Sequence, residues 1–221
     1  MAAGIGLQGA VISPTLEATK RGRALAAALE ASGQPVERVD DAALAKLADT
    51  EQPQGVVAVV EPRQWLLADI SLRPRSAVLV LDSVQDPGNV GTMMRTAFGL
   101  GAAGVVALPG TVEFTNPKVL RGSMGAAFRL PNVPATTEAF LEWAKAHGVG
   151  LWVADAAGAP VTRRKSTAPL ALIVGNEGAG VGPALTAAAE QRISIPLVPG
   201  SESLNVGAAA AILLYEVLRD D

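Results

Sequence analysis

Arg95 lies in a stretch that carries no other charged residue between Asp86 and Glu113. It follows Asn89 by six residues, somewhat under two turns of a helix, and methionine, alanine and phenylalanine lie close to it in the sequence. An arginine stays protonated in proteins, so it is poorly suited to act as a general base. It could instead hold a phosphate or stabilise a negative charge that develops during a reaction. The structural alternative is an arginine on the exposed side of an amphipathic helix.

A glycine-rich turn is the second stretch with possible chemistry. The apolar run Leu170–Val174 has the pattern of a buried strand, and the sequence GNEGAG follows it directly. This turn begins with Gly175 and carries Asn176 and Glu177 between its glycines. Glycines let the backbone approach a ligand closely, which favours a binding loop. The alternative is a plain tight turn, although such a turn would need fewer glycines.

The third stretch is the C-terminal segment that begins at Arg192. A short strand around Ile193 and Ile195 leads into residues 196–203, whose two prolines and one glycine cannot continue a strand. A helix is predicted at 204–218, and its apolar, alanine-rich sequence is typical of a helix buried on more than one side. The polar loop SESLN therefore lies at the start of a helix, where backbone N–H groups are free to bind a ligand.

These stretches need a scaffold, and strand and helix patterns alternate from Ala77 onward. This alternation predicts an α/β fold with a parallel sheet and helices on both faces. A strand ending at Leu81 would deliver Asp82 to the carboxyl edge of the sheet, where such folds bind ligands. Asn89 and Thr136 are predicted to cap helices. Strands are predicted at 78–81, 104–108, 127–130, 149–154 and 170–174, and helices at 89–100, 116–122 and 136–146.

The first part of the chain shows the same alternation on a smaller scale. Strands are predicted at 10–12, 36–39 and 55–60, with a helix from about 17 or 19 to Gly33 and a short helix capped by Asp40. The VVAVV run at 55–60 is typical of a strand buried on both faces. Residues 61–75 contain two prolines and lack periodicity, which predicts a linker with one helical turn around Trp65. We therefore divide the chain into domains at 1–70 and 71–221.

Composition excludes several kinds of site and of protein. The chain has 221 residues and no cysteine, which excludes disulfides, thiolate zinc sites and a cysteine nucleophile. The single histidine, His147, argues against a histidine metal site or a Ser-His triad and is read as a residue at a helix end. No apolar run approaches a membrane span and no signal peptide is evident, so we expect a cytoplasmic protein without a metal.

The charge balance gives a mixed indication for nucleic acid. A net charge of −3 argues against a general nucleic-acid coat, but local basic patches can still bind RNA. Candidates for such patches are Lys20, Arg21 and Arg23, then Arg73 and Arg75, and Arg163, Arg164 and Lys165. Lys118, Arg121 and Ser123 form a further candidate group on a short segment. The alternative for each group is an ordinary solvated surface.

One motif match is misleading. GLGAAG at 99–104 fits the dinucleotide-binding pattern G-x-G-x-x-G, which belongs between a strand and the helix that follows it. Here the pattern follows a predicted helix and precedes a predicted strand. We interpret these glycines as a helix C-cap and a tight turn.

Three motifs in order resemble those of the SpoU (TrmH-like) ribose 2′-O-methyltransferases of the SPOUT superfamily. N-x5-R-T at Asn89 to Thr96 resembles the first motif, LIVGNEGAGV the second, and IPLVPGSESLNV the third. The resemblance covers residues 77–221. The segments SPTLEATKRGRAL and QPQGVVAVV resemble the L30e-like RNA-binding domain that precedes many such enzymes, although the strand and helix expected before Ile12 would be missing or abbreviated.

The resemblance implies S-adenosylmethionine as the cofactor and a ribose 2′-hydroxyl of RNA as the methyl acceptor, with rRNA favoured over tRNA. It implies a C-terminal trefoil knot, a homodimer with the active site near its interface, and no metal. The residues implied to bind the cofactor are Gly175, Asn176, Glu177, Ile195, Pro196 and Leu204. The implied catalytic residues are Asn89, Arg95, Ser203 and Asn205, and Lys20, Arg21, Arg23, Lys118 and Arg121 are the candidates for contacts with RNA.

Two other functions remain open at the level of the sequence. One is a non-catalytic RNA- or ribosome-binding protein on the same fold, and the other is a methyltransferase acting on a base or on a substrate other than RNA. The joint presence of Asn89, Arg95, Glu177, Ser203 and Asn205 argues against the first. The SLN triplet together with N-x5-R favours ribose chemistry over the second. Gly207 stands where the family usually has a serine or another small residue, so no side chain acts there.

Overall fold

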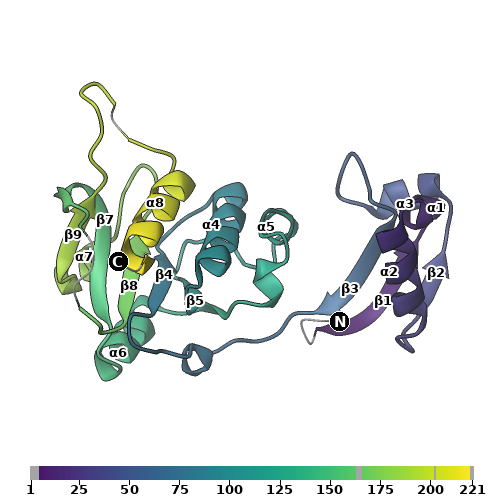
Figure 1. Ribbon diagram of the computed structural model, residues 1–221, viewed down its shortest axis with the longest axis horizontal. Coiled ribbons are helices and arrows are strands. Elements are labelled where there is room, and N and C mark those ends of the chain that lie inside the picture. Colours follow the sequence, from purple (N-terminus) through teal and green to yellow (C-terminus); the bar gives the residue numbers. More distant parts are fainter. Residues whose placement is uncertain (1–4, 163–165, 202, 220–221) are drawn as a thin grey trace. The chain divides into compact units, whose positions relative to one another are not determined.

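The protein is described by a computed structural model that covers residues 5–162, 166–201 and 203–219. The chain divides into two compact units, Met1–Arg63 and Gln64–Asp221 (Figure 1). Each unit has its own sheet, so each is described by itself.

The smaller unit is a three-stranded sheet in the order β2-β1-β3. In this sheet β1 (Gly6–Ile12) runs parallel to β2 (Val36–Arg38) and antiparallel to β3 (Val56–Glu61). The predicted first helix is divided into α1 (Pro14–Glu17) and α2 (Lys20–Glu30), because Thr19 caps α2 by accepting a hydrogen bond from the Gly22 N–H. Asp40 caps α3 (Asp41–Leu47) as predicted, and Ile12, Leu16 and Leu29 lie in the small core.

The prediction that the VVAVV strand is buried on both faces is wrong. β3 pairs only with β1 and forms an edge of its sheet. The side chain of Val59 is 65% exposed, and Ala58 is exposed as well. The physical reason is that an apolar run is buried on both faces only where layers cover both faces of the sheet.

The larger unit is an α/β fold with a parallel six-stranded sheet in the order β6-β5-β4-β8-β7-β9. Its strands are β4 (Ala77–Leu81), β5 (Gly104–Ala107), β6 (Asn132–Pro134), β7 (Gly150–Pro160), β8 (Leu170–Val174) and β9 (Gln191–Ser194). Its helices are η1 (Leu67–Asp69), α4 (Pro87–Leu100), α5 (Pro117–Gly122), η2 (Ala126–Phe128), α6 (Thr137–Ala146), α7 (Pro183–Ala188) and α8 (Val206–Leu218).

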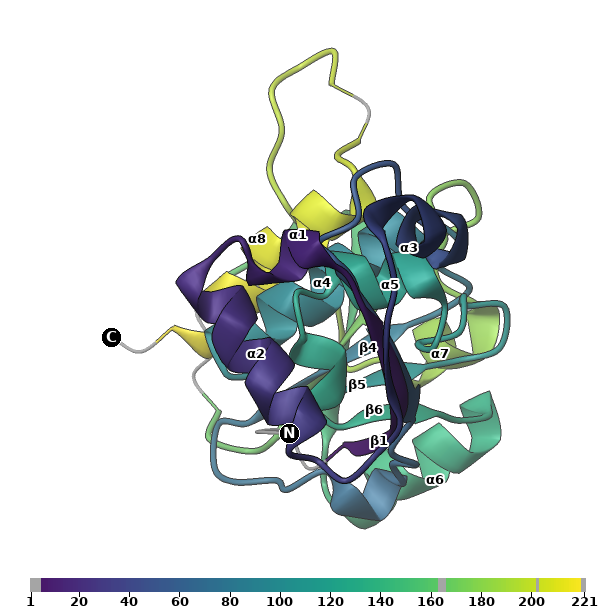
Figure 2. The same cartoon turned by 90° about the vertical axis from the view of Figure 1, so that its right-hand side faces the viewer.

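Helices cover both faces of this sheet, as predicted. Leu79 and Leu81 of β4 pack with apolar residues of α4 and α8, whereas Val78 and Val80 point to the opposite face and pack with α6. Figure 2 shows α4 and α5 on one side of β4, β5 and β6 and α6 on the other. All five residues of β4 and of β8 are buried, which makes these two strands the centre of the unit.

Several element boundaries differ from the predictions. The strand predicted at 127–130 is wrong, because the helix η2 occupies that segment and the edge strand is β6, three residues that include Asn132 and Pro134. The Asn132 amide donates to the carbonyls of Ala127 and Leu130 and holds this turn. The helix α7 was not predicted, although Pro183 at its first position is a signal for a helix start. The GLGAAG segment begins at the end of α4 and reaches the start of β5. Gly101 has a φ of 79° and forms the C-cap of α4, which agrees with the interpretation of these glycines as a cap and a tight turn.

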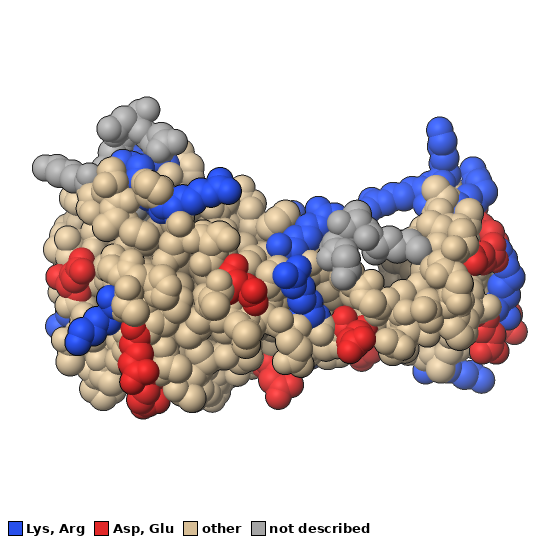
Figure 3. All heavy atoms as spheres, turned by 90° about the horizontal axis from the view of Figure 1, so that it is seen from below, with Lys and Arg blue, Asp and Glu red and all other residues tan. Residues whose placement is uncertain are grey.

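Among the described residues, no helix is long and apolar enough to cross a membrane. On the face shown in Figure 3, Lys and Arg side chains are interspersed with Asp and Glu side chains. Charges of both signs on that face agree with the small net charge of the chain.

Candidate active site

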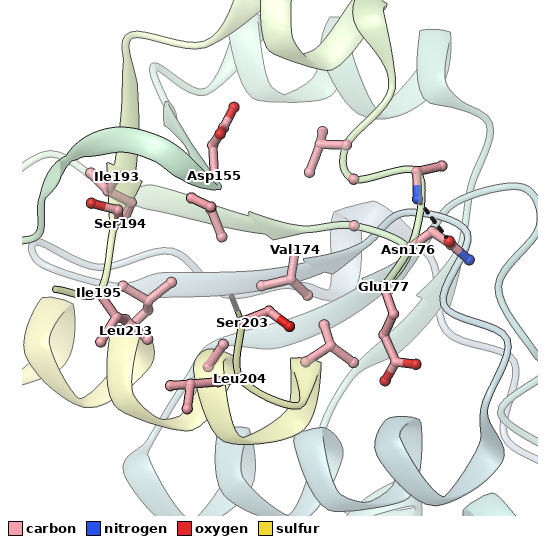
Figure 4. Close-up of a pocket in the computed structure, with 18 of the residues that line it drawn as sticks. Asp155, Val174, Asn176, Glu177, Ile193, Ser194, Ile195, Ser203, Leu204 and Leu213 are labelled. Carbon is pink, nitrogen blue, oxygen red and sulfur yellow. Dashed lines mark hydrogen bonds between the residues drawn. The ribbon is translucent and has the colours of Figure 1, made fainter. Parts of the chain in front are cut away.

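A cavity of about 470 Å³ lies at the carboxyl ends of β8 and β9 and beside β7. Its walls come from the glycine-rich turn after β8, the loop before α8, and one side of α8 itself (Figure 4). Volumes of this size are typical of small-molecule sites, and the carboxyl edge is where parallel α/β sheets place them.

The glycine-rich turn is closed by its own backbone. Asn176 and Gly180 exchange two hydrogen bonds, of 3.0 Å from the Asn176 N–H and 2.8 Å from the Gly180 N–H. A Cβ atom at Gly175 would lie 2.2 Å from the Gly180 carbonyl oxygen, so a side chain cannot fit there. The Asn176 Oδ1 atom accepts hydrogen bonds from the N–H groups of Gly178 and Ala179. Asn176 therefore shapes the turn with both its backbone and its side chain.

The loop after β4 anchors the glycine-rich turn. The Asn176 Nδ2 atom donates to the Ser83 carbonyl oxygen at 3.0 Å, and the Gly182 N–H donates to Asp82 Oδ2 at 2.7 Å. Ser83 has a φ of 57°, a left-handed conformation that non-glycine residues rarely adopt. Asp82, predicted to stand at the carboxyl edge, is 92% buried there and acts as an anchor for the turn.

The loop before α8 supplies the opposite wall. Ile195, Ser203 and Leu204 line the cavity, and Leu213 of α8 lies beside them (Figure 4). Pro196 is the next residue after Ile195 but does not line the cavity. The structure thus brings together five of the six residues expected to hold a cofactor, with Pro196 just outside.

Three polar side chains form a hydrogen-bonded chain at the rim of the cavity. Asn205 Nδ2 donates to Asn89 Oδ1 at 3.0 Å, and Asn89 Nδ2 donates to Glu177 Oε1 at 2.6 Å. Asn205 Oδ1 also accepts from the N–H groups of Gly207 and Ala208, so Asn205 is the N-cap of α8. Through this chain, the start of α8 and the first turn of α4 fix the position of the Glu177 carboxylate.

The prediction that Asn89 caps α4 is wrong. Asp86 is the N-cap, and its carboxylate accepts a hydrogen bond from the Asn89 N–H at 2.7 Å. Pro87 at the first helical position favours this start, because its missing N–H needs no partner there. Because Asp86 occupies the cap position, the Asn89 side chain is free to bridge Asn205 and Glu177.

Arg95 lies on α4, less than two turns after Asn89. It is exposed on α4 and does not line the cavity. Six residues of helix place its Cα about 9 Å along the axis from Asn89. A guanidinium at that place can reach a bound polymer more readily than a small ligand inside the cavity.

Asp155 lines the cavity but was missed by the sequence interpretation. The Ala157 N–H and the Arg192 guanidinium both donate hydrogen bonds to its carboxylate. These bonds hold the pKa of Asp155 below its ordinary value, and the bond from Ala157 has the larger effect. The signal that could have found it is its place directly after the predicted strand at 149–154. Figure 4 shows Asp155 near Ser194, away from Glu177.

The candidate RNA contacts lie on both units. Lys20, Arg21 and Arg23 are exposed on α2, and Lys118 and Arg121 are exposed on α5. Ser123 is wrong as a contact, because it is 1% exposed and its hydroxyl donates to the Leu120 carbonyl. Arg73 is exposed and Arg75 half-buried, and the basic run at 163–165 lies outside the described residues.

The described residues contain no group of three or more His, Cys, Asp or Glu side chains that could hold a metal ion. His147 is the C-cap of α6, with its Nδ1 atom 2.8 Å from the Trp143 carbonyl oxygen. This geometry agrees with its interpretation as a residue at a helix end.

Two family models match the chain, one within the larger unit and one over most of the smaller unit and the first three residues of the larger. Residues 76–215 match the SpoU rRNA methylase family. The chain belongs to this family. Residues 7–66 match the RNA 2′-O ribose methyltransferase substrate-binding family.

Curated relatives in this family carry activities in their names. The 23S rRNA (guanosine(2553)-2′-O)-methyltransferase RlmP of Bacillus subtilis is 40% identical over 176 residues, covering 79% of this chain and 69% of that protein. The 23S rRNA (uridine(2479)-2′-O)-methyltransferase of Streptomyces viridochromogenes is 33% identical over 184 residues, covering 76% of this chain and 61% of that protein. Among the relatives compared, the chain spans between 52% and 80% of their lengths.

Solved structures of the family resemble the whole chain. The SpoU methyltransferase AviRb from Streptomyces viridochromogenes, in complex with S-adenosylmethionine, matches with a TM-score of 0.85 and 28% identity over 98% of this chain and 84% of that one. The S-adenosylmethionine-bound rRNA methyltransferase from Sinorhizobium meliloti matches with a TM-score of 0.83 and 31% identity over 98% of this chain and 81% of that one.

Proposed function

We propose that this protein transfers a methyl group from S-adenosylmethionine to a ribose 2′-hydroxyl of RNA, with ribosomal RNA as the favoured substrate. The observation that carries the proposal is the cavity between the GNEGAG turn and the SLN loop, with the chain Asn205–Asn89–Glu177 at its rim. Family membership supports the reaction class, and the relatives named as acting on 23S rRNA favour ribosomal over transfer RNA.

The cavity fits S-adenosylmethionine in size and in chemistry. Ile195, Leu204 and Leu213 offer an apolar surface for an adenine ring. The close approach of Gly175 to Gly180 leaves backbone groups, not side chains, to face the ligand at the end of β8. The carboxylate of Asp155 is ionised at neutral pH and can accept hydrogen bonds from hydroxyl or amino groups.

The protein's own residues position the acceptor and stabilise charge. S-adenosylmethionine supplies a methyl group that its sulfonium already activates, so alignment of the 2′-hydroxyl is the main requirement. Asn89 and Asn205 hold Glu177 in place, and the exposed Ser203 hydroxyl can orient the ribose. Arg95 stays protonated, so we assign it to an RNA phosphate or to the charge that develops on the attacking oxygen.

A methyl-transfer assay with radiolabelled S-adenosylmethionine and in vitro transcribed 23S and 16S rRNA tests this proposal. We expect label in 23S rRNA and a 2′-O-methylated nucleoside in the digest, identified by mass spectrometry. Calorimetry should give micromolar affinity for the cofactor, about −8 kcal/mol. RNA binding without cofactor binding or methyl transfer would instead favour the non-catalytic RNA-binding function.

The smaller unit is proposed to hold the RNA substrate. Residues 1–70 would form an L30e-like domain and residues 71–221 the methyltransferase domain, a boundary seven residues after the one between the two compact units. The match of residues 7–66 to a substrate-binding family and the exposed cations of α2 support this role. Because phosphate contacts release counterions, RNA affinity should fall as the salt concentration rises.

Finer features of the fold are proposed on the same basis. A trefoil knot would involve the chain after β9, which returns so that α8 packs against α4 and β4. A homodimer is supported by the exposed apolar residues Ile212 and Tyr215, because they would be covered on association. Sedimentation of the protein and of Ile212→Glu tests the dimer: a monomeric wild type would contradict it. An enzyme acting on rRNA would work in the cytoplasm.

A further inference from the structure

A second cavity, of about 510 Å³, lies at the carboxyl ends of β5 and β6 and shares no lining residue with the first. Its walls are mostly apolar and include Leu108, Pro109, Phe114 and Pro134. Glu113 is the one charged residue among those that line it. A largely apolar cavity with a few placed polar groups is the usual form of a site for a ring-bearing ligand.

This cavity opens on the same sheet edge as the cofactor cavity. β5 and β8 are the two neighbours of β4, so the strand ends below the two cavities are separated by two strand spacings, about 10 Å. A single residue links their walls: the Ser83 hydroxyl donates to the Pro109 carbonyl at 3.1 Å, and the Ser83 carbonyl accepts from Asn176 Nδ2 at 3.0 Å. The Val112 N–H also donates to the Val84 carbonyl at 3.0 Å.

Cations follow the second cavity directly in the chain. Thr115 lines the cavity, and the next residue, Asn116, is the N-cap of α5. Lys118 and Arg121 are exposed on that short helix. A polyanion whose phosphates lie along α5 would therefore pass the mouth of the cavity.

We propose that this second cavity takes an unpaired nucleobase of the RNA substrate and that Glu113 selects guanine there. The inference rests on the proposed function and adds a second RNA-reading site to it. Proteins recognise single-stranded RNA mainly by holding splayed bases against apolar surfaces and bonding to their edges. A carboxylate accepts hydrogen bonds and donates none. Among the four bases, only guanine presents two adjacent donors, N1–H and N2–H, to its two oxygens.

The negative charge of Glu113 favours a role in selecting one base over a role in general affinity for RNA. A carboxylate near a path for phosphates weakens nonspecific RNA binding by repulsion. Glu113 precedes Lys118 and Arg121 by five and eight residues in the chain. Its Oε2 atom accepts a 3.5 Å hydrogen bond from the Thr115 hydroxyl, and the remaining acceptor positions of the carboxylate are left for a base. The other polar side chains of the cavity are in part committed to the fold: the Thr111 hydroxyl donates to the Leu81 carbonyl, and Thr136 caps α6.

A nucleotide titration tests the cavity without requiring methyl transfer. Amide spectra of the isotope-labelled full-length protein would be recorded with millimolar GMP and, separately, AMP. We expect saturable shifts at residues 108, 110–115 and 135 with GMP and weaker shifts with AMP. Equal shifts with both nucleotides, or shifts confined to residues 175–180, would overturn the proposal.

Glu113→Gln, paired with Glu142→Gln on the exposed side of α6, tests the role in turnover. With 23S rRNA as substrate, kcat/KM of Glu113→Gln should fall about 10-fold, the usual effect of one lost base contact, while cofactor affinity is unchanged. Guanosine-to-inosine replacement in the RNA should lower turnover by the wild type and have little further effect on the variant. Equal kcat/KM for the two variants would refute the selection. If the wild type methylates no RNA, the proposed function fails, and the nucleotide titration still decides whether the cavity binds guanine.

Discussion

Strands β8 (LALIV) and β3 (VVAVVE) are both largely apolar runs, yet their surroundings differ. All five residues of β8 are buried, whereas β3 has no buried residue. β8 lies inside a six-stranded sheet with helices on both faces, and β3 forms the edge of a three-stranded one. The difference shows that the burial of an apolar strand is determined by the layers around it and not by its own composition.

The contrast extends to function. The glycine-rich turn of the proposed cofactor site follows β8, and Asp82 and Ser83, which anchor that turn, follow β4. A site attached to two fully buried strands is held in place by the core of the unit. The smaller unit instead presents exposed cations on α2, which suits contacts that need affinity more than exact placement.

The largest expected effect tests this contrast in stability. Ile173→Ala, in β8, should destabilise the larger unit by about 2–5 kcal/mol, because it leaves a cavity in a closely packed core. Val59→Ala, in β3, should cost no more than about 1 kcal/mol. Hydrogen exchange of peptides from each unit, followed by mass spectrometry, measures both effects. A similar loss of protection for the two variants would contradict the difference in burial.

The sequence could predict the centre of the larger unit better than its edges. β4 and β8 are continuous apolar runs, so their positions and the turns after them were readable. β6 was not readable, because a three-residue strand with Asn132 and Pro134 depends on its pairing with Val105 to Ala107. Pairing of this kind joins residues far apart in the sequence, which a local pattern does not record.

The candidate site shows the same division. The residues of the GNEGAG turn and the SLN loop were predicted together, because the resemblance to the SpoU family implies that both motifs hold the cofactor and because both follow strand ends. The bridge from Asn89 to Glu177 was not predicted, since it joins residues 88 positions apart and a cap was the simpler interpretation of Asn89. Asp86 followed by Pro87 was the signal for the true helix start.

Arg95→Ala tests the functional side of the contrast and should give the next largest effect. If Arg95 stabilises developing charge, kcat should fall about 10²–10³-fold, with fold and cofactor affinity unchanged. Arg95→Lys should also be slow, because lysine lacks the planar fork of donors. The control is Arg129→Ala, another exposed arginine of the same unit, which should keep wild-type turnover. A near wild-type kcat for an Arg95→Ala protein that folds and binds the cofactor would show that Arg95 has only a structural role.

Substitutions on α2 should affect RNA affinity and not the chemical step. Arg21→Ala should raise KM for RNA a few-fold, leave kcat unchanged, and reduce the slope of log affinity against log salt by about 0.7 if it contacts one phosphate of a single strand. Lys46→Ala on α3 is the control within the same unit. An unchanged salt slope for Arg21→Ala would remove this residue from the RNA contacts.

The smallest expected effect is a dependence of the smaller unit on pH. The Ser13 hydroxyl donates to Asp41 Oδ1 at 2.5 Å and the Thr15 N–H donates to the same atom at 3.2 Å, and these bonds hold the pKa of Asp41 below its ordinary value. A folded pKa below the unfolded one means that the stabilisation is present above the unfolded value of about 3.9 and is lost as pH falls through the folded value. Asp41→Asn should therefore weaken protection of β1 and α3 at pH 6 and weaken it less at pH 2. Glu51→Gln, a substitution at an exposed residue of the same unit, should not change the protection at either pH.

Equal protection of Asp41→Asn and wild type at pH 6 would show that the ionised carboxylate does not hold α3 against β1. The larger unit should show no response to Asp41→Asn at either pH, because the bonds that Asp41 makes lie within the smaller unit.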